Sequence, residues 1–155
     1  MYPCMFWKNK FQGRLVEIRK GMKSNIKYQK SNMKNTNQKL KSEFKKRLYN
    51  FTLRLIEFID RLPNDNVSKR IGDQLLRSGT SILGNYIEGQ SASSKRDFSN
   101  YFNTSLKSAN ESKLWLALLR DSKRAKPEEV AWFLKELDEF SNIFGSSILT
   151  LKGRR

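Results

Sequence analysis

Four stretches of this chain place core-type residues at steps of three and four, and this spacing predicts four helices. In the first stretch, Phe44, Leu48, Phe51, Leu55 and Phe58 follow one another in this way and lead to Leu62. Because an α-helix turns once in 3.6 residues, such spacing draws one stripe along one side of a helix. The other three predicted stripes are Val67, Ile71, Leu75, Ser78, Ile82 and Asn85; Phe98, Phe102, Ser105, Ala109, Ser112, Leu116 and Leu119; and Val130, Leu134, Leu137, Ser141, Phe144, Ile148 and Leu151.

Turn and capping residues separate the predicted helices. Residues 63–66 (PNDN) end the first helix, and residues 89–93 close the second. Ser94 and Asp97 have the spacing of a capping box at the start of the third, and Pro127 suits the first turn of the fourth. Short connections favour antiparallel neighbours, so we predict an all-α fold, an up-down-up-down antiparallel four-helix bundle.

The positive charge is concentrated before the bundle. The chain has 31 Lys and Arg against 15 Asp and Glu, a formal net charge of +16, and residues 1–47 hold 14 of the basic but 2 of the acidic residues. Residues 23–41 are low in complexity and apolar content, which predicts disorder. We therefore divide the chain into a basic extension, 1–41, and a bundle domain, 42–152. A start at Met22 or Met33 would shorten the extension.

Composition excludes several kinds of chemistry. The chain has no histidine and one cysteine, Cys4, which removes most zinc, haem and iron–sulfur sites and all histidine-dependent catalysis. We predict no enzymatic activity, no cofactor, no metal and no small-molecule substrate; a carboxylate-dependent nuclease is the least favoured class. The absence of an 18-residue apolar run argues against a transmembrane helix, and the N-terminal residues do not have the order of a secretory signal. A cytoplasmic location is expected.

Several motifs of the predicted bundle occur in a known order. They are residues 74–81 (QLLRSGTS), Asn85, Glu88, residues 94–98 (SKRDF), residues 108–112 (SANES) and Trp115 with Leu116. Over residues 43–151 the chain resembles the bacterial four-helix bundle proteins encoded in intervening sequences of large-subunit rRNA. The resemblance implies homopentamers of four-helix protomers. A relative, the accessory variability determinant of diversity-generating retroelements, binds nucleic acid and a reverse transcriptase, which makes both of them expected partners.

Basic residues of the bundle domain are the candidate contacts to nucleic acid, gathered on one end or edge of the bundle. The alternative is an ordinary solvated face. The candidates are Lys45, Lys46, Arg47, Lys95, Arg96, Lys107, Lys113, Arg120, Lys123, Arg124 and Lys126.

A second set of residues is predicted to fix helix pairing or a subunit interface through a polar network. The alternative to a network is a set of unrelated surface charges. Trp115 is expected to pack in the core or in a subunit interface rather than to stack on bases. The small residues Gly72, Ser78, Gly79, Ser81 and Gly84 are expected to let helices approach closely. The network candidates are Arg77, Ser78, Asn85, Glu88, Glu111 and Trp115.

Together these features predict a non-enzymatic, oligomeric adaptor that binds RNA or DNA electrostatically, through the basic arm, the bundle edge or both. The alternative reading of the arm is a solvated tail of biased composition. The alternative function is a structural assembly protein of unassigned role, encoded in an rRNA intervening sequence, with no direct contact to nucleic acid.

Overall fold

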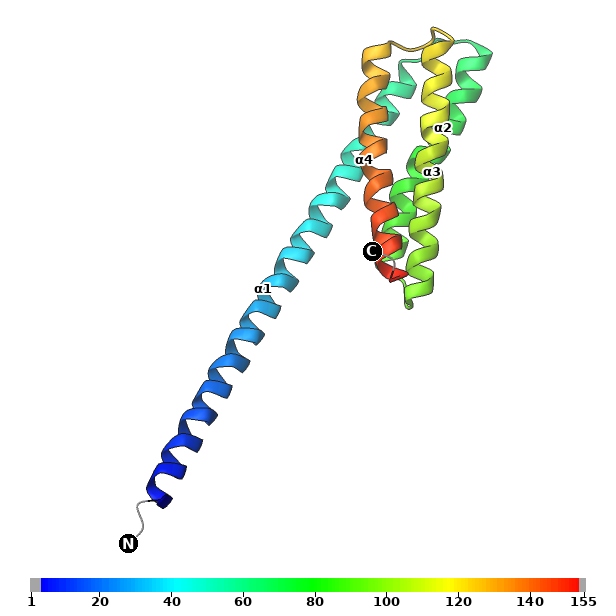
Figure 1. The fold of residues 1–155 in the computed structure, drawn as a ribbon. Coiled ribbons are helices and arrows are strands. Elements are labelled where there is room, and N and C mark those ends of the chain that lie inside the picture. Colours follow the sequence, from blue (N-terminus) through cyan, green and yellow to red (C-terminus); the bar gives the residue numbers. More distant parts are fainter. Residues whose placement is uncertain (1–3, 154–155) are drawn as a thin grey trace. The chain divides into compact units, whose positions relative to one another are not determined.

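The chain folds into helices joined by short connections. The computed structural model describes the backbone of residues 4–153 and the side chains of residues 17, 20, 23, 24, 27 and 29–153. It contains, over that part of the chain, α1 (Cys4–Asp60), α2 (Asn66–Gln90), α3 (Lys95–Asp121) and α4 (Pro127–Leu151) (Figure 1). None of these helices has the length and apolar content, over its described residues, that crossing a bilayer requires.

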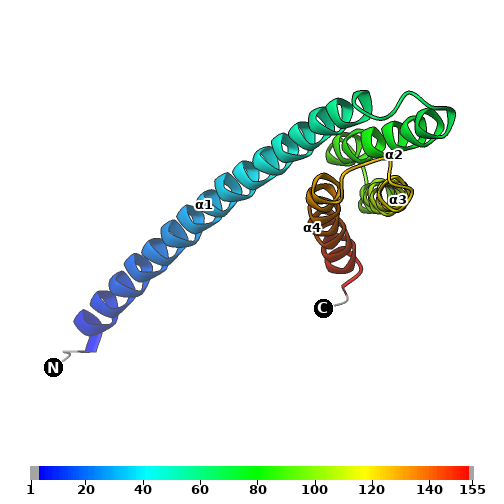
Figure 2. The same cartoon turned by 90° about the horizontal axis from the view of Figure 1, so that it is seen from above.

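Two compact units make up the chain, Met1–Glu43 and Phe44–Arg155, and α1 contributes to both. In the second unit, the end of α1 joins α2, α3 and α4 in an antiparallel bundle that runs up, down, up and down (Figure 1). Figure 2 shows α3 and α4 nearly end-on, beside one another. The predicted all-α four-helix bundle is confirmed.

The bundle core is rich in phenylalanine. The Phe51 ring lies edge-on to those of Phe133 and Phe140, with centroids 5.6 and 5.2 Å apart. This differs from the predicted stripe of α4, in which Leu134 and Ser141 were expected inside; both are only half-buried. Burying two aromatic rings removes more apolar surface from water than burying a leucine and a serine, so α4 turns its phenylalanines inward. The buried apolar residues are Leu48, Phe51, Leu55, Phe58, Leu75, Ile82, Tyr86, Phe102, Ala109, Leu116, Leu119, Val130, Phe133, Leu137, Phe140, Phe144 and Ile148.

Side-chain caps define where α2 and α3 begin. Asp65 accepts hydrogen bonds from the backbone N–H groups of Val67 (2.9 Å) and Ser68 (3.1 Å). Ser94 accepts one from the N–H of Asp97 (3.1 Å) and donates its hydroxyl to that carboxylate (2.6 Å). These bonds satisfy donors that a helix leaves unpaired at its first turn.

Two glycines of α2 allow α1 to approach closely. A Cβ atom at Gly79 would lie 2.1 Å from Leu55, and one at Gly72 would lie 3.3 Å from Ile59. The same role was expected of Gly84, and that expectation is wrong, because a Cβ there would meet nothing within 4 Å. Gly84 belongs to the exposed side of α2.

Residues 23–41 also differ from expectation, because α1 runs through them as a continuous helix. Low apolar content does leave them without a core, and every side chain from residue 29 to residue 43 is exposed. Yet the segment has no helix-breaking residue, since α1 lies between Pro3 and Pro63, and its Lys, Gln, Met and Leu are good helix formers. Solvation and helical structure are therefore compatible here.

Candidate nucleic-acid interface

Arg47, one of the candidate contacts, is engaged inside the bundle. Its Nε and Nη2 atoms donate to the Glu136 carboxylate at 2.8 Å each, and Nη2 also reaches Glu139 at 2.5 Å. The hydrogen bond that Arg47 donates to Glu136 is the main cause that raises the pKa of Arg47, and Arg47 in turn lowers the pKa of Glu139. Arg47 therefore joins α1 to α4.

Three further candidates are neutralised by neighbouring carboxylates. Lys113 pairs with Asp138 at 2.6 Å, and Arg120 pairs with Asp121 at 2.8 Å. Arg124, in the connection between α3 and α4, lies 3.5 Å from Asp65, in the connection between α1 and α2. A phosphate would have to compete with these carboxylates, which makes the three side chains weak anion contacts.

The remaining candidates are exposed but dispersed. Lys95 and Arg96 begin α3, whereas Lys123 and Lys126 follow its end. With 27 residues, α3 spans about 40 Å, so the two pairs lie at opposite ends of the bundle. The structure does not gather the predicted basic residues on one end. The seven exposed candidates are Lys45, Lys46, Lys95, Arg96, Lys107, Lys123 and Lys126.

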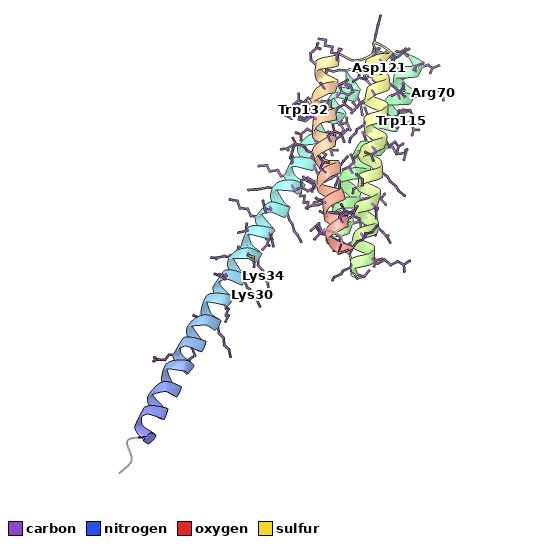
Figure 3. All side chains as sticks on the ribbon, viewed as in Figure 1. Lys30, Lys34, Arg70, Trp115, Asp121 and Trp132 are labelled. Carbon is purple, nitrogen blue, oxygen red and sulfur yellow. The ribbon has the colours of Figure 1, made fainter. Side chains whose placement is uncertain are left out.

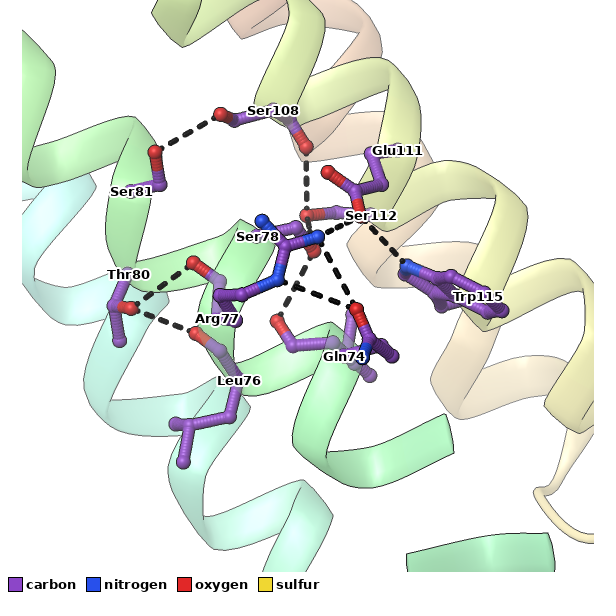
Figure 4. Close-up of polar contacts among 11 residues, drawn as sticks. Gln74, Leu76, Arg77, Ser78, Thr80, Ser81, Ser108, Glu111, Ser112 and Trp115 are labelled. Atoms are coloured by element: carbon purple, nitrogen blue, oxygen red, sulfur yellow. Dashed lines mark hydrogen bonds and ion pairs between the residues drawn. The ribbon is translucent and has the colours of Figure 1, made fainter. Parts of the chain in front are cut away.

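Five of the six network candidates do come together, between α2 and α3, and Figure 4 shows four of them, Arg77, Ser78, Glu111 and Trp115. Arg77 forms an ion pair with Glu111, which also accepts from the Trp115 indole N–H at 3.3 Å. Deeper in the seam, the hydroxyls of Ser78 and Ser112 are 2.8 Å apart.

The serine contacts continue along the seam with Ser81 and Ser108, whose hydroxyls are 3.0 Å apart. Asn85 donates from Nδ2 to the backbone oxygen of Ser81 (2.8 Å) and to its hydroxyl (2.9 Å). Glu88 lies outside this network, exposed, in an open depression that Ser91 and Tyr101 also line. Hydroxyl pairs at core positions let α2 and α3 approach closely while keeping buried polar atoms bonded.

A second set of contacts, missed at the level of sequence, joins α1 to α4. Arg54 stacks over the Trp132 ring, 3.8 Å from its centroid, and Arg61 forms an ion pair with Glu129. Together with Arg47 they form an arginine ladder, defined here as Arg47, Arg54 and Arg61. The seven-residue spacing of these arginines was the available signal.

The first unit carries a row of lysines that sequence reasoning also missed. Lys20, Lys23, Lys27, Lys30 and Lys34, here called the lysine face, recur at steps of three and four, and all five are exposed. At 100° per residue they fall within about 80° of the helix circumference and extend over about 21 Å. Four of them, Lys23, Lys27, Lys30 and Lys34, line one shallow, open depression. Figure 3 labels Lys30 and Lys34 on α1.

None of the five lysines forms an ion pair with a described carboxylate, although Glu17 stands three residues before Lys20. Glu43, the acidic residue that follows Glu17 in sequence, forms an i,i+4 pair with Lys39, at 4.0 Å. Both residues lie about 100° or more around the helix from the lysine face. The described residues also contain no group of acidic or cysteine side chains arranged to hold a metal ion. The lysine face is therefore a row of five exposed basic side chains without an ion pair to a described carboxylate.

Comparisons with known proteins agree with this bundle. Residues 40–146 match the family model described as 23S rRNA-intervening sequence protein. A similar solved structure is that of a protein with unknown function from the S23 ribosomal protein family of Bacteroides thetaiotaomicron VPI-5482. It shares 33% sequence identity and a TM-score of 0.63, over 67% of this chain and 96% of that one. No curated protein matched. The match over residues 40–146 shows that the chain belongs to the 23S rRNA-intervening sequence protein family.

Proposed function

We propose that the protein is a non-enzymatic adaptor that binds nucleic acid through the lysine face of α1. The observation that carries the proposal is the alignment of five exposed lysines, Lys20 to Lys34, on one side of a helix. Phosphates held at regular intervals on a polynucleotide attract such a row, and each neutralised phosphate releases counterions. The lysine face precedes residues 40–146, so the proposal concerns this chain and not its family.

The bundle contributes less to binding in this proposal. Arg47, Lys113, Arg120 and Arg124 are paired with carboxylates. Of the seven exposed candidates, four are divided between the two ends of α3, two lie on α1, and Lys107 lies along α3 between its ends. No feature of the described residues points to a reverse transcriptase, so the proposal names nucleic acid alone.

Replacement of four lysines by glutamine tests the proposal. The variant carries Lys23→Gln, Lys27→Gln, Lys30→Gln and Lys34→Gln in the full chain. Binding to a mixture of labelled RNA and DNA oligonucleotides is measured by fluorescence anisotropy at low salt. We expect affinity to fall at least tenfold because four phosphate contacts are lost.

A matched control removes the same amount of charge from the bundle. Its changes are Lys46→Gln, Lys95→Gln, Arg96→Gln and Lys107→Gln, all at exposed positions. This control should keep most of the affinity. Equal losses in the two variants, or no binding by the unchanged protein, would refute the proposal.

A second candidate function is self-assembly, favoured by an exposed apolar patch on the bundle. Tyr49, Leu53 and Ile56 follow one another on the outer side of α1, with 54%, 44% and 37% of their surfaces exposed. Leu76 and Ile87 are similarly exposed on α2, with Leu83 half-buried between them. Leu55 of α1 lies opposite Gly79 of the antiparallel helix α2. The exposed residues of α1 and those of α2 therefore lie at the same height along the bundle, on either side of the α1–α2 seam.

Contiguous exposed apolar surface of this kind marks protein interfaces. We define the apolar patch as Tyr49, Leu53, Ile56, Leu76, Leu83 and Ile87. The family resemblance implies five copies, and two different faces meeting head to tail would close such a ring. Native mass spectrometry of the full chain measures the assembly directly, and a monomer at micromolar concentration would exclude this candidate.

A further inference from the structure

We infer that helix formation in residues 29–43 of α1, here called the exposed stretch, is coupled to anion binding by the lysine face. Neutralising the lysines stabilises the helix, and the stability of the helix in turn sets the affinity for the anion. The inference rests on the proposed function and names how its site is regulated. It follows from the solvation of the exposed stretch, from the spacing of the lysines and from the helix propensities of the residues.

The exposed stretch depends on local interactions for its helical structure. All fifteen side chains from residue 29 to residue 43 are described, and every one is exposed. Most helices in proteins owe their stability to an apolar face that packs against the rest of the molecule. Because no side chain of the exposed stretch is buried or half-buried, hydrogen bonds along the helix and contacts between neighbouring side chains must stabilise it.

The spacing of the lysines acts against the helix. Lys20, Lys23, Lys27, Lys30 and Lys34 form four successive pairs at steps of three or four, and like charges at such steps destabilise a helix. Summed over four pairs, this repulsion corresponds to about a 4- to 30-fold shift of the helix–coil equilibrium towards coil. Phosphates bound along the row would cancel this repulsion, so a bound polyanion favours the helix.

The residue types of the exposed stretch keep the equilibrium close to balance. Asn32, Thr36 and the asparagines on either side of Thr36 have lower helix propensities than lysine or leucine. On the other side of the balance, α1 continues into the bundle, where Leu48 and Phe51 are buried. A helix that grows from an existing end avoids the cost of nucleation. A modest change in charge or propensity therefore shifts the helical population of the exposed stretch.

Two uncharged positions test the coupling without touching the lysines. Asn32 and Thr36 lie about 160° around the helix from the middle of the lysine face. The Thr36 hydroxyl donates to the backbone oxygen of Asn32 at 2.9 Å. One variant carries Asn32→Ala with Thr36→Ala, and the other carries Asn32→Gly with Thr36→Gly, both in the full chain. Binding to the mixed RNA and DNA oligonucleotides is measured by fluorescence anisotropy at low salt.

We expect the alanine variant to bind about fivefold more tightly than the glycine variant. Alanine favours the helix over glycine at both positions, and the apparent affinity falls with the fraction of binding-competent helix. The net charge and the lysines are the same in the two variants. A difference in affinity between them therefore reports the helix and not the electrostatic contacts.

The bundle provides a closely matched control. Asn100 and Thr104 of α3 have the same residue types and spacing, both are exposed, and the Thr104 hydroxyl donates to the backbone oxygen of Asn100 at 3.0 Å. Packing holds α3 in its helical form, since Ser105 and Ala109 beside them are buried. The corresponding alanine and glycine variants at positions 100 and 104 should therefore bind the oligonucleotides alike.

A second measurement follows the helix in the absence of nucleic acid. Amide hydrogen exchange over residues 29–43 is compared at 20 and 500 mM sodium chloride. Salt screens the repulsion between lysines, so exchange in the unchanged protein should slow by about threefold at the higher concentration. The variant with glutamine at positions 23, 27, 30 and 34 lacks this repulsion and should exchange equally slowly at both concentrations.

The outcomes separate this inference from the proposed function. If the alanine and glycine variants of α1 bind alike while the unchanged protein binds, the inference is wrong and nucleic-acid binding stands. An equal difference between the α3 variants would also overturn it, because the effect would then come from the bundle. Exchange over residues 29–43 that salt does not slow would show that repulsion between the lysines does not weaken the helix, which contradicts the inference. If the unchanged protein binds no oligonucleotide, the proposed function fails and the inference fails with it.

Discussion

At the scale of single residues, the bundle contains positions at which a close neighbour excludes any larger side chain. Gly79 faces Leu55 so closely that a methyl group would overlap it, whereas Gly84 faces open space. The two glycines are five residues apart in the same helix and share its backbone conformation. Replacing each glycine by alanine therefore separates the steric effect of the added methyl group from its effect on backbone entropy.

We expect Gly79→Ala to destabilise the protein by about 1–3 kcal/mol, because Leu55 is fully buried and must move. Gly84→Ala should instead stabilise it by about 0.5–1 kcal/mol, since alanine loses less entropy in a helix. Urea denaturation of the two variants measures both values. A stabilising Gly79→Ala would mean that α1 and α2 are less tightly packed than described.

Asp65 gives the bundle a pH-dependent contribution. Hydrogen bonds, first that from the Ser68 hydroxyl, lower the pKa of Asp65 from 3.8 to about 2. The folded state therefore binds this proton less readily than the unfolded state. The stabilisation is complete above about pH 4 and disappears as the pH falls towards 2.

Asp65→Asn keeps a capping oxygen without the charge. The difference in melting temperature between the natural protein and this variant should be largest above pH 4 and shrink towards pH 2. Asp65→Ala serves as the comparison, because it removes the cap and should lower the melting temperature throughout this range. A constant difference for Asp65→Asn would show that ionisation of Asp65 is not the cause.

At the scale of helices, the seams of the bundle differ in chemistry. The α2–α3 seam is lined by serines with Arg77 and Glu111 at its edge, and the α1–α4 seam by aromatic rings and the arginine ladder. Burial of apolar surface supplies most of the free energy that stabilises both seams. The polar contacts select how the two helices of each seam are aligned along their axes.

Arg47→Met should reduce the free energy of unfolding by about 1–2 kcal/mol, because it leaves the carboxylate of Glu136 unpaired at a site that is 15% exposed. Arg120→Met is the control, since Arg120 pairs only with its exposed neighbour Asp121, and should change stability by less than about 0.5 kcal/mol. Chemical denaturation compares them. Equal effects would argue against a special role for Arg47.

At the scale of the whole molecule, the sequence predicted the number, order and direction of the bundle helices, because heptad spacing and turn residues specify them directly. It predicted Val130, Leu137, Phe144 and Ile148 of the α4 core, but not Phe133 and Phe140, which are buried where Leu134 and Ser141 were expected. Composition argued for disorder in residues 23–41, where helix propensity and the lysine spacing were the better signals.

The candidate site was predicted in part. That the basic extension would carry the anion-binding charge was among the expectations, but its arrangement as one face was not. Of the bundle candidates, Arg47 could not be excluded from sequence, because its partners Glu136 and Glu139 lie in the last helix. Pairing over such separations requires the fold.

Self-assembly provides a test at this scale. Leu53→Gln together with Leu76→Gln should shift the full chain towards smaller species in native mass spectrometry, because both changes weaken the apolar patch. Neither side chain is buried, so the melting temperature of the bundle should change little. Leu149→Gln, at an exposed position on α4, is the control and should leave the assembly unchanged.

The arginine ladder has a consequence for how the chain finds its fold. Heptad stripes repeat, so α1 could slide along α4 by seven residues and still place apolar side chains together. The partners of the ladder do not repeat, since they run from Glu136 through the Trp132 ring to Glu129. A chain displaced by one heptad would put Arg54 at Glu136 and leave Glu129 without its arginine. Misregistered folding intermediates are thereby made less stable than the native pairing, and refolding should proceed without a long-lived trapped population.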